Sequence, residues 1–278
     1  MKKGEPGFRI SSSVSAYDEA MDALSSLITK KCRADKMVVD HRYELMFDYV
    51  KILELEEPIS KMKIIHVAGT KGKGSRCVYT EAILRNCGFH TGPFTSPHLI
   101  DVRERFRLNG KNAVIYSNAV FILLPCFTCF QNICSRVDVA IMEVGLGGRI
   151  DATNMVQTPI VCGITPLGYD HTKVLGNILG AIAGEKAGIF KKGVPAFTVS
   201  QPEEAMEVLN KKALIRKLPN WMTHHHVKHH VALQDRSPGN RILRSDYGAH
   251  SPESMEVCAN WFSIANKEDN SLKESSQV

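Results

Sequence analysis

The chain lacks any concentrated run of basic residues, although its 278 residues carry a net charge of +6. Because nucleic-acid-binding domains gather lysine and arginine on one face or stripe, the scattered charge argues against nucleic acid as a partner. The small positive excess mildly favours an anionic ligand instead. A second Cys-x-x-Cys pair is also lacking, since only Cys126 and Cys129 of the eight cysteines have this spacing. One pair does not complete a four-cysteine zinc site, and its apolar surroundings favour inert buried thiols over a redox role.

The N-terminus lacks the apolar core of a secretory signal. Lys2, Lys3 and Arg9 give it a weak transit-peptide character, but Glu5 and the brevity of the segment argue against that interpretation. We therefore expect the cysteines to be reduced and mostly buried rather than joined in a disulfide framework.

Long hydrophobic runs are lacking as well. The most apolar stretch, residues 114–130, is marginal in length for a membrane span and contains Asn118 and Pro125. We expect a buried helix or an irregular segment there. Hydrophobic residues make up 44% of the chain and charged residues 23%, which is typical of a globular protein of one or two domains.

What is present is a glycine-rich turn between a predicted strand and a predicted helix. Residues 64–68 form a short, β-favouring apolar run, and helical periodicity follows at 77–84. Between them, Gly69, Gly72 and Gly74 can adopt backbone angles that bring the chain close to a ligand. A helix that begins directly after such a turn presents unpaired N–H groups, which suit a phosphate.

The side chains of this turn strengthen the phosphate interpretation. The spacing Gly-x-x-Gly-Lys-Gly-Ser is a tightened form of a phosphate-binding loop. In such a loop Lys73 reaches the outer phosphates, and the Ser75 hydroxyl contacts the nucleotide or its magnesium. The alternative is a glycine turn that binds nothing, which the lysine and serine make the poorer explanation.

Two further apolar runs, at 137–144 and 159–164, predict parallel strands buried on both faces. In doubly wound sheets, ligands gather at the carboxyl ends of the strands. Glu143 lies near the end of the first run and is a candidate magnesium ligand, with an ion-paired or capping glutamate as the alternative. His171 follows the second run, where a ligand and a structural histidine are equally good interpretations.

Helical periodicity predicts core-facing helices at 16–27 and 43–55, with Pro58 marking the end of the second. A third helix is predicted at 178–190 and contains Lys186, which by itself would be interpreted as a surface lysine.

Six motifs, in this order along the chain, carry a resemblance to a known family. They are His-Val-Ala-Gly-Thr-Lys-Gly-Lys-Gly-Ser (66–75), Phe-Thr-Ser-Pro-His-Leu (94–99), Val-Arg-Glu-Arg-Phe (102–106), Glu-Val-Gly-Leu-Gly-Gly-Arg-Ile-Asp-Ala-Thr-Asn (143–154), Asp-His-Thr (170–172) and Gly-Glu-Lys-Ala-Gly-Ile (184–189). Together they resemble folylpolyglutamate synthase, of the Mur ligase group, and the wording is similar to its plant members. The resemblance covers most of residues 16–110 and 137–205.

The resemblance implies ATP-dependent addition of L-glutamate to the γ-carboxylate of a reduced folate, through an acyl phosphate. The implied nucleotide contacts are Gly69, Thr70, Lys71, Gly72, Lys73, Gly74, Ser75 and His250. The implied magnesium ligands are Ser96, Glu143 and His171. The implied catalytic residues are Lys73, His171 and Lys186, the last as the lysine that becomes carbamylated in the family. A monovalent cation is a further candidate cofactor beside ATP and magnesium.

The chain departs from the family pattern in two places. Residues 110–135 are shorter than the family segment that helps to close the folate site, and their wording is unrelated. After residue 207, most of the family's C-terminal domain is missing. Near the end, Tyr247 stands where the family has a nucleotide-contacting aspartate, and the nucleotide-contacting arginine has no counterpart. These departures predict that ATP binding survives better than glutamate ligation.

A histidine cluster, His224–His230, lies in the departing segment. Its spacing matches no tetrahedral zinc pattern, so a flexible polar loop is the better explanation.

We therefore predict an α/β fold with a mostly parallel sheet flanked by helices. Residues 1–207 are assigned to a Mur-ligase-type ATP-binding domain, and residues 208–278 to an incomplete, Rossmann-like remnant with a disordered tail. The leading function is folylpolyglutamate synthase. The alternatives are dihydrofolate synthase and a nucleotide-binding remnant without ligase activity. We expect a monomer in the cytoplasm, with the mitochondrion or plastid as other compartments.

Overall fold

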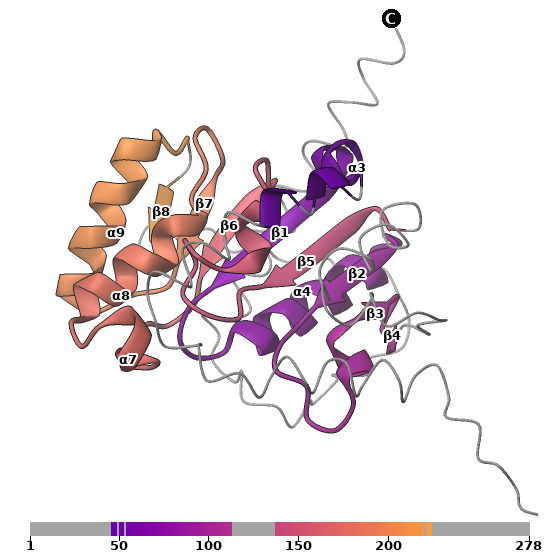
Figure 1. The fold of residues 1–278 in the computed structure, drawn as a ribbon, viewed down its shortest axis with the longest axis horizontal. Helices are drawn as coiled ribbons and strands as arrows, with labels where there is room; N and C mark the ends of the chain where they lie inside the picture. The colour runs from indigo at the N-terminus through magenta and orange to yellow at the C-terminus, as the bar shows by residue number, and fades with distance from the viewer. Residues whose placement is uncertain (1–45, 49, 53, 113–136, 220, 224–278) are drawn as a thin grey trace, which may run out of the picture.

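A computed structural model of the chain describes residues 46–48, 50–52, 54–112, 137–219 and 221–223. Its centre is a six-stranded sheet with the order β2-β5-β1-β6-β7-β8, in which all neighbouring strands are parallel (Figure 1). These strands are β1 (Lys63–Ala68), β2 (Thr91–Phe94), β5 (Val139–Glu143), β6 (Val161–Ile164), β7 (Ala196–Thr198) and β8 (Trp221–Thr223). A two-stranded antiparallel hairpin, β3 (Arg107–Leu108) and β4 (Lys111–Asn112), follows β2 in the chain.

Helices cover both faces of this sheet. The α-helices are α3 (Glu56–Lys61), α4 (Lys73–Asn86), α7 (Thr172–Leu175), α8 (Leu179–Lys186) and α9 (Glu203–Arg216), and the 3-10 helices are η2 (Val102–Arg105), η3 (Ala152–Met155) and η4 (Ala187–Ile189). The predicted α/β class with a parallel sheet is confirmed. The predicted strands at 64–68, 137–144 and 159–164 are β1, β5 and β6, which are neighbours in the sheet.

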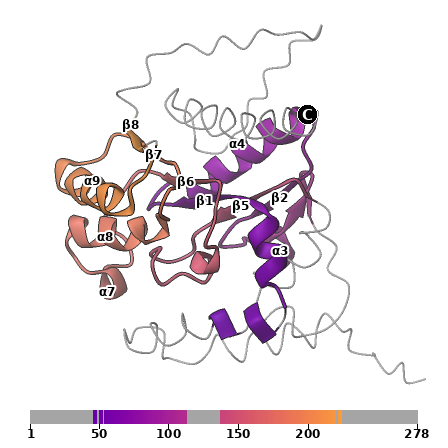
Figure 2. The same ribbon diagram turned by 90° about the horizontal axis from the view of Figure 1, so that it is seen from above.

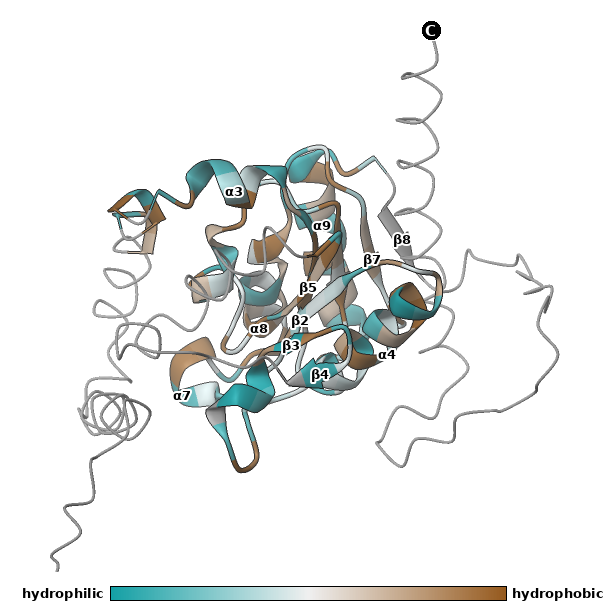
Figure 3. Ribbon diagram, turned by 90° about the vertical axis from the view of Figure 1, so that its right-hand side faces the viewer, coloured by the Kyte–Doolittle hydropathy of each residue, from teal (hydrophilic) through white to brown (hydrophobic). Residues whose placement is uncertain are grey.

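Alternation along β1 explains how both faces are buried. Ile65 and Val67 pack with Cys77 and Leu84 of α4 on one face. Ile64 packs on the other face with residues around α3, and Figure 2 shows α4 and α3 on opposite sides of the sheet. Because both faces are covered, the central strands are buried along almost their whole length and are mostly apolar rather than alternating, and Figure 3 shows hydrophobic colour on the inner strand β5.

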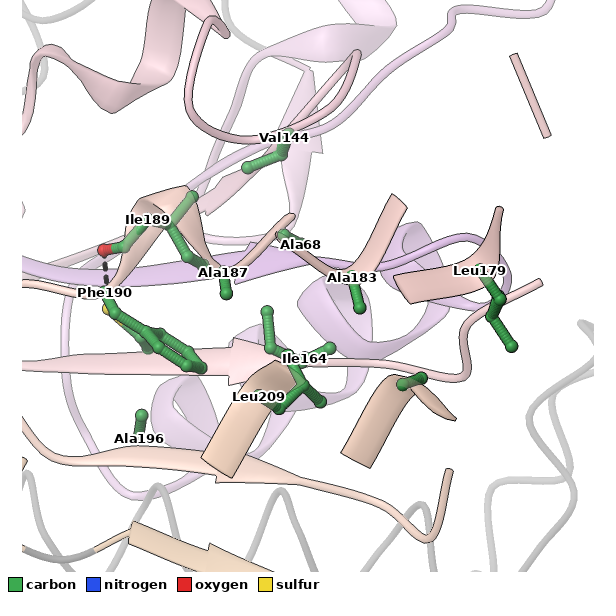
Figure 4. Packing of buried hydrophobic residues seen from close by; sticks show 12 residues of the cluster. Ala68, Val144, Ile164, Leu179, Ala183, Ala187, Ile189, Phe190, Ala196 and Leu209 are labelled. Carbon is green, nitrogen blue, oxygen red and sulfur yellow. Dashed lines mark hydrogen bonds between the residues drawn. The ribbon is translucent and has the colours of Figure 1, made fainter. Parts of the chain in front are cut away.

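The second face is filled by small and branched side chains from α8, η4 and α9. Figure 4 shows Ala183 and Ala187 lying close to the strands, with Phe190 and Leu209 beside Ile164 of β6. The small residues allow α8 to approach the sheet closely, so its C-terminal end lies directly behind the ends of the central strands. This close packing brings α8 next to the functional site.

Two details of the helix predictions are wrong. Pro58 does not end a helix: the chain turns at Glu54, which has a φ of 53°, and Pro58 lies in the first turn of α3. Proline is tolerated there because the first N–H groups of a helix have no intrahelical partner. The helix predicted at 178–190 is α8 followed by the tighter turn η4, in which Gly188 lies against the backbone of Arg149.

Position 207, the predicted end of the first domain, lies inside α9. This helix packs in the core with α8, and β8 pairs in parallel with β7, so the sheet extends to Thr223. The division of the chain into two domains stays a prediction, because residues 224–278 lie outside the described ranges.

Several other predictions also fall outside the described residues. They concern the helix at 16–27, the apolar stretch 114–130, the pair Cys126 and Cys129, the cluster His224–His230, and His250. Among the residues that are described, no helix is long and apolar enough to cross a membrane.

Candidate functional site

The glycine loop between β1 and α4 packs tightly against the end of β6. Gly69 has a φ of +144°, and a Cβ added there would lie 1.9 Å from the Thr165 hydroxyl oxygen. Gly72 adopts the left-handed conformation and caps α4, which begins at Lys73. The helix therefore starts two residues before Ser75, and the Lys-Gly-Ser sequence forms its first turn. Glycine is required at these two positions by close approach and by positive φ, respectively.

The loop is held by a carbonyl from the segment after β6. The N–H groups of Thr70 and Lys71 both donate to the Pro166 carbonyl, each at 3.1 Å. The Thr70 hydroxyl in turn exchanges hydrogen bonds of 3.1 Å with the backbone of Gly168. The N–H groups of Thr70 and Lys71 are thus already engaged, so they are not free for an anion.

The unpaired N–H groups lie at the beginning of α4. Within the described ranges, the N–H groups of Gly72, Lys73 and Ser75 have no protein acceptor, while that of Gly74 donates to Glu143. Unpaired N–H groups at a helix start, with the positive end of the helix dipole, form an anion site.

Gln201, which the sequence analysis did not single out, supports this arrangement from behind. Its side-chain oxygen accepts from the Leu167 N–H at 2.9 Å, and its amide nitrogen donates to the Thr165 carbonyl at 3.1 Å and the Thr198 hydroxyl at 3.0 Å. One side chain therefore clamps both sides of Pro166, whose carbonyl holds the glycine loop.

We expect Gln201→Ala to weaken nucleotide binding by roughly tenfold, because the lost hydrogen bonds release the segment that orders the loop. Gln157→Ala is the matched control, since Gln157 is exposed and its amide bonds only locally, to the Met155 carbonyl. Titration calorimetry with an ATP analogue measures both. Equal affinity in the two variants would show that the clamp does not order the site.

The ends of β1, β2, β5 and β6 surround a cleft of about 720 Å³. Its walls are Thr70, Gly72, Lys73, Gly74, Ser75, Ser96, Pro97, Arg105, Glu143, Gly145, Asp170 and His171. The structure thus brings Lys73, Ser96, Glu143 and His171 together, as predicted, while Gly69 and Lys71 do not line the cleft. Arg105 is a cation that the sequence analysis did not select, and its Nε bonds to His98 Nδ1 at 2.9 Å.

Glu143 is the buried carboxylate of this cleft. One of its oxygens accepts from the Ser96 N–H at 2.9 Å, and the other lies 4.0 Å from the Lys73 ammonium nitrogen. Burial raises the pKa of Glu143, and this is opposed by the N–H groups of Ser96 and Gly74 and by the Lys73 charge. Gly74 lies so close to Glu143 that a Cβ added at Gly74 would be 3.2 Å from the carboxylate. A carboxylate that burial disfavours in its charged form is stabilised further when a cation binds.

His171 also lines the cleft. It has a φ of 49° and caps α7. Its ring is half exposed, 3.6 Å from the Asp170 carboxylate. Among the described residues, no group of three or more histidine, cysteine or acidic side chains is arranged to hold a metal. The predicted set of Ser96, Glu143 and His171 contains only two such residues, so it stays a prediction.

Lys186 is buried behind the glycine loop, not on the surface. It is 4% exposed, and its ammonium donates to the Gly69 carbonyl at 2.7 Å. Burial and the charge of Lys73 lower its pKa to about 8, against the opposing effect of Asp170 and Asp151.

A buried polar chain connects the loop after β5 to the centre of the sheet. Asp151 accepts from the N–H groups of Gly145 at 3.0 Å and Leu146 at 2.8 Å, and also from the Thr153 hydroxyl. That hydroxyl lies 2.9 Å from His66 Nε2. Because the hydroxyl proton is given to Asp151, His66 must donate from Nε2, which agrees with a pKa lowered by burial to about 3. The Asp-Ala-Thr-Asn motif contributes Asp151 and Thr153 to this chain of hydrogen bonds, and only the fold shows that role.

No family model matches the chain. Among curated proteins, the folylpolyglutamate synthase of Arabidopsis thaliana is 44% identical over 346 residues, covering 92% of this chain and 60% of the relative. The mitochondrial folylpolyglutamate synthase of Homo sapiens is 43% identical over 231 residues, covering 71% of this chain and 38% of the relative. Over most of its length, the chain is similar to folylpolyglutamate synthases.

A solved complex of folylpolyglutamate synthase (FPGS) with AMPPCP and folate matches the fold of this chain with a TM-score of 0.61 and 26% identity. The match covers 73% of this chain and 53% of the solved chain. The chain therefore spans about 60% of the length of the plant synthase and about half of the length of the solved synthase. The alignment with the plant synthase runs over 346 residues, whereas the chain has 278, so at least 68 aligned residues of the synthase have no counterpart here.

Proposed function

We propose that this chain binds magnesium-ATP in the cleft and uses it to add L-glutamate to the γ-carboxylate of a reduced folate. The observation that carries the proposal is the pairing of two features in one cleft. The unpaired N–H groups and Lys73 at the start of α4 form an anion site, and the Glu143 carboxylate lies 4.0 Å from the Lys73 nitrogen. Homology to folylpolyglutamate synthases supports the choice of substrates.

The proposed reaction consists of two transfers. The γ-phosphoryl group of ATP passes to the folate γ-carboxylate with release of ADP, and the glutamate amine then displaces phosphate to form the amide. Lys73 and the N–H groups of α4 stabilise charge on the phosphoryl oxygens without reorganising, because the loop is held by Pro166 and Gln201. Arg105, which also lines the cleft, supplies a second positive charge to it.

The residues present fit a magnesium ion. Glu143 provides a carboxylate, Ser96 a hydroxyl and His171 an imidazole, all on the wall of the same cleft. A magnesium ion held there would neutralise phosphate charge and orient the outer phosphates. The assignment of these three residues is a proposal, as is the role of His250, which lies outside the described residues.

Lys186 is proposed as the carbamylated lysine. The reaction needs a neutral amine, and with a pKa of about 8 roughly half of the Lys186 amines are neutral near pH 8, whereas an ordinary lysine is protonated there. We expect a carbamate on Lys186 in bicarbonate at pH 8.5 and little at pH 6.5, measured by alkylative trapping and mass spectrometry. Lys191 is the internal control, because burial lowers its pKa to about 8 but it bonds to the Asn154 carbonyl, away from the cleft. An unmodified Lys186, or equal modification of both lysines, would contradict a site-specific role.

The wider proposal follows the homologues. Folylpolyglutamate synthase is favoured over dihydrofolate synthase and over a remnant without ligase activity, because the similar curated proteins carry the first name. We propose a monomer that acts on small molecules, with no nucleic acid partner and no membrane span. The cytoplasm is the proposed compartment, and the mitochondrion is the alternative that the names of the mammalian relatives support.

The test is ATP-dependent incorporation of labelled glutamate into tetrahydrofolate, run beside ATP binding on the same preparation. We expect incorporation above the level of a Lys73→Ala variant. If the protein binds ATP but incorporates no glutamate, the assignment of the nucleotide site stands and ligase activity is refuted. Because the chain lacks residues that its relatives have, the ratio of ligation to binding also tests the predicted weakness of ligation.

A further inference from the structure

A second hollow adjoins the phosphate cleft. Its volume is about 540 Å³, and it shares Gly74, Ser75, Ser96, Pro97 and Glu143 with the cleft. Its other walls are Val78 and Tyr79 of α4, Thr95 and Leu99 after β2, Glu104, and Arg107 of β3. The two hollows therefore lie side by side, with Glu143 and Ser96 in their shared wall. A molecule in the second hollow can extend one end to the phosphates.

Arg107 is the one cation among the residues that line this second hollow. Its side chain is half-buried, and its Nε is buried without a hydrogen-bond partner among the described residues. Pairing of Arg107 with Asn112 in the hairpin fixes its backbone. A buried guanidinium N–H without an acceptor is costly, so the arrangement favours a ligand that supplies an acceptor. A carboxylate matches the fork of an arginine best.

The neighbouring acidic residues are committed elsewhere. Glu104 accepts from the N–H groups of Leu99, Ile100 and Asp101, and hydrogen bonds to these N–H groups lower its pKa. Glu104 thus stabilises the loop after β2 instead of pairing with Arg107. Glu143 is bonded to the N–H groups of Ser96 and Gly74 at the other end of the hollow. The Arg107 charge is therefore left for a ligand.

We propose that this hollow, the Arg107 pocket, receives the folate whose γ-carboxylate accepts the phosphoryl group, with Arg107 binding a carboxylate that does not react. The inference rests on the proposed function. The terminal glutamyl group of a folate has two carboxylates, and binding of the α-carboxylate to Arg107 directs the γ-carboxylate toward the phosphate cleft. Arg107 would then determine which carboxylate is activated. Free glutamate also carries a spare carboxylate, but it is too small and polar to cover Val78, Pro97 and Leu99.

The test compares two ligands and three variants by equilibrium binding, in the presence of an ATP analogue. The ligands are a monoglutamyl folate and pteroate, which has no glutamyl carboxylates. We expect Arg107→Gln to weaken the monoglutamyl folate by roughly ten- to a hundredfold, the range of a charge-assisted hydrogen bond, and to leave pteroate unchanged. Arg107→Lys should restore part of the loss, because it keeps the charge and loses the fork. Lys111→Gln is the matched control, since Lys111 is an exposed cation on the paired strand of the same hairpin and lines neither hollow.

Each other result overturns the inference. If Arg107→Gln weakened the binding of pteroate as much as that of the folate, Arg107 would only shape the pocket and would not bind a glutamyl carboxylate. Unchanged folate binding together with a raised KM for glutamate would move the carboxylate contact to the second substrate. A parent protein that binds the ATP analogue but neither folate ligand would refute the proposed function itself, which separates that failure from a failure of Arg107 alone.

Discussion

Lys73→Ala is expected to weaken binding of magnesium-ATP by roughly a hundredfold or more. This is the loss that follows when one or two charge-assisted hydrogen bonds of about 1.5–3 kcal/mol each are removed. The backbone N–H groups of α4 remain, so some binding should persist. Titration calorimetry at fixed magnesium gives the affinity. The fold should be unaffected, because the lysine side chain packs in the cleft and not in the apolar clusters.

Lys71→Ala is the matched control for this variant. It removes the same charge from the same loop, but Lys71 is exposed and does not line the cleft. The ATP affinities of the two variants should therefore differ widely. If the loop attracted phosphate only through its overall charge, the two substitutions would weaken ATP binding equally. The loop assignment fails if Lys73→Ala binds as tightly as the parent. A second consequence is independent of ligand: the pKa of Lys186 should rise, because the charge of Lys73 is one of the causes that lower it.

Magnesium is expected to increase the affinity for ATP, and Glu143→Gln is expected to reduce this increase by at least tenfold. Loss of groups that merely support a metal ligand already costs about 10–100-fold in affinity, and here the proposed ligand loses its charge. The amide oxygen can still accept from the Ser96 N–H, so the local backbone should hold. Affinity for the nucleotide is measured across a magnesium titration and again with a chelator. An unchanged magnesium dependence would remove Glu143 from the metal site.

The pH dependence gives a second readout for Glu143. Magnesium binds the ionised carboxylate, and burial raises the pKa of this group. Magnesium-dependent affinity should therefore fall on acidification at a higher pH than for an exposed glutamate, and Glu143→Gln should abolish that pH dependence. Asp138→Asn is the control, because Asp138 precedes the same strand at its opposite end and pairs with His90 on the surface.

The central strands and the loop could be predicted because their signals are local. A run such as residues 64–68 is largely apolar, with His66 as the exception, because both faces of β1 are covered, and the glycines follow at once in the chain. Glu143 and His171 were selected for the same reason, because Glu143 lies near the end of one predicted buried strand and His171 follows another. Pro58 was misinterpreted because a proline in the first turn and a proline after the last turn produce the same local pattern.

Motif and periodicity determined by themselves the parallel sheet, the phosphate loop and the family resemblance. Tertiary structure alone decided which groups surround them. Lys186 reaches the Gly69 carbonyl across 117 positions, and Thr70 reaches Gly168 across 98. The clamp of Gln201 and the orphaned Nε of Arg107 are likewise consequences of strand order and helix placement. The physical reason is that a buried polar group must find its partner wherever packing brings one, and that location is set by the assembled fold rather than by neighbours in the sequence.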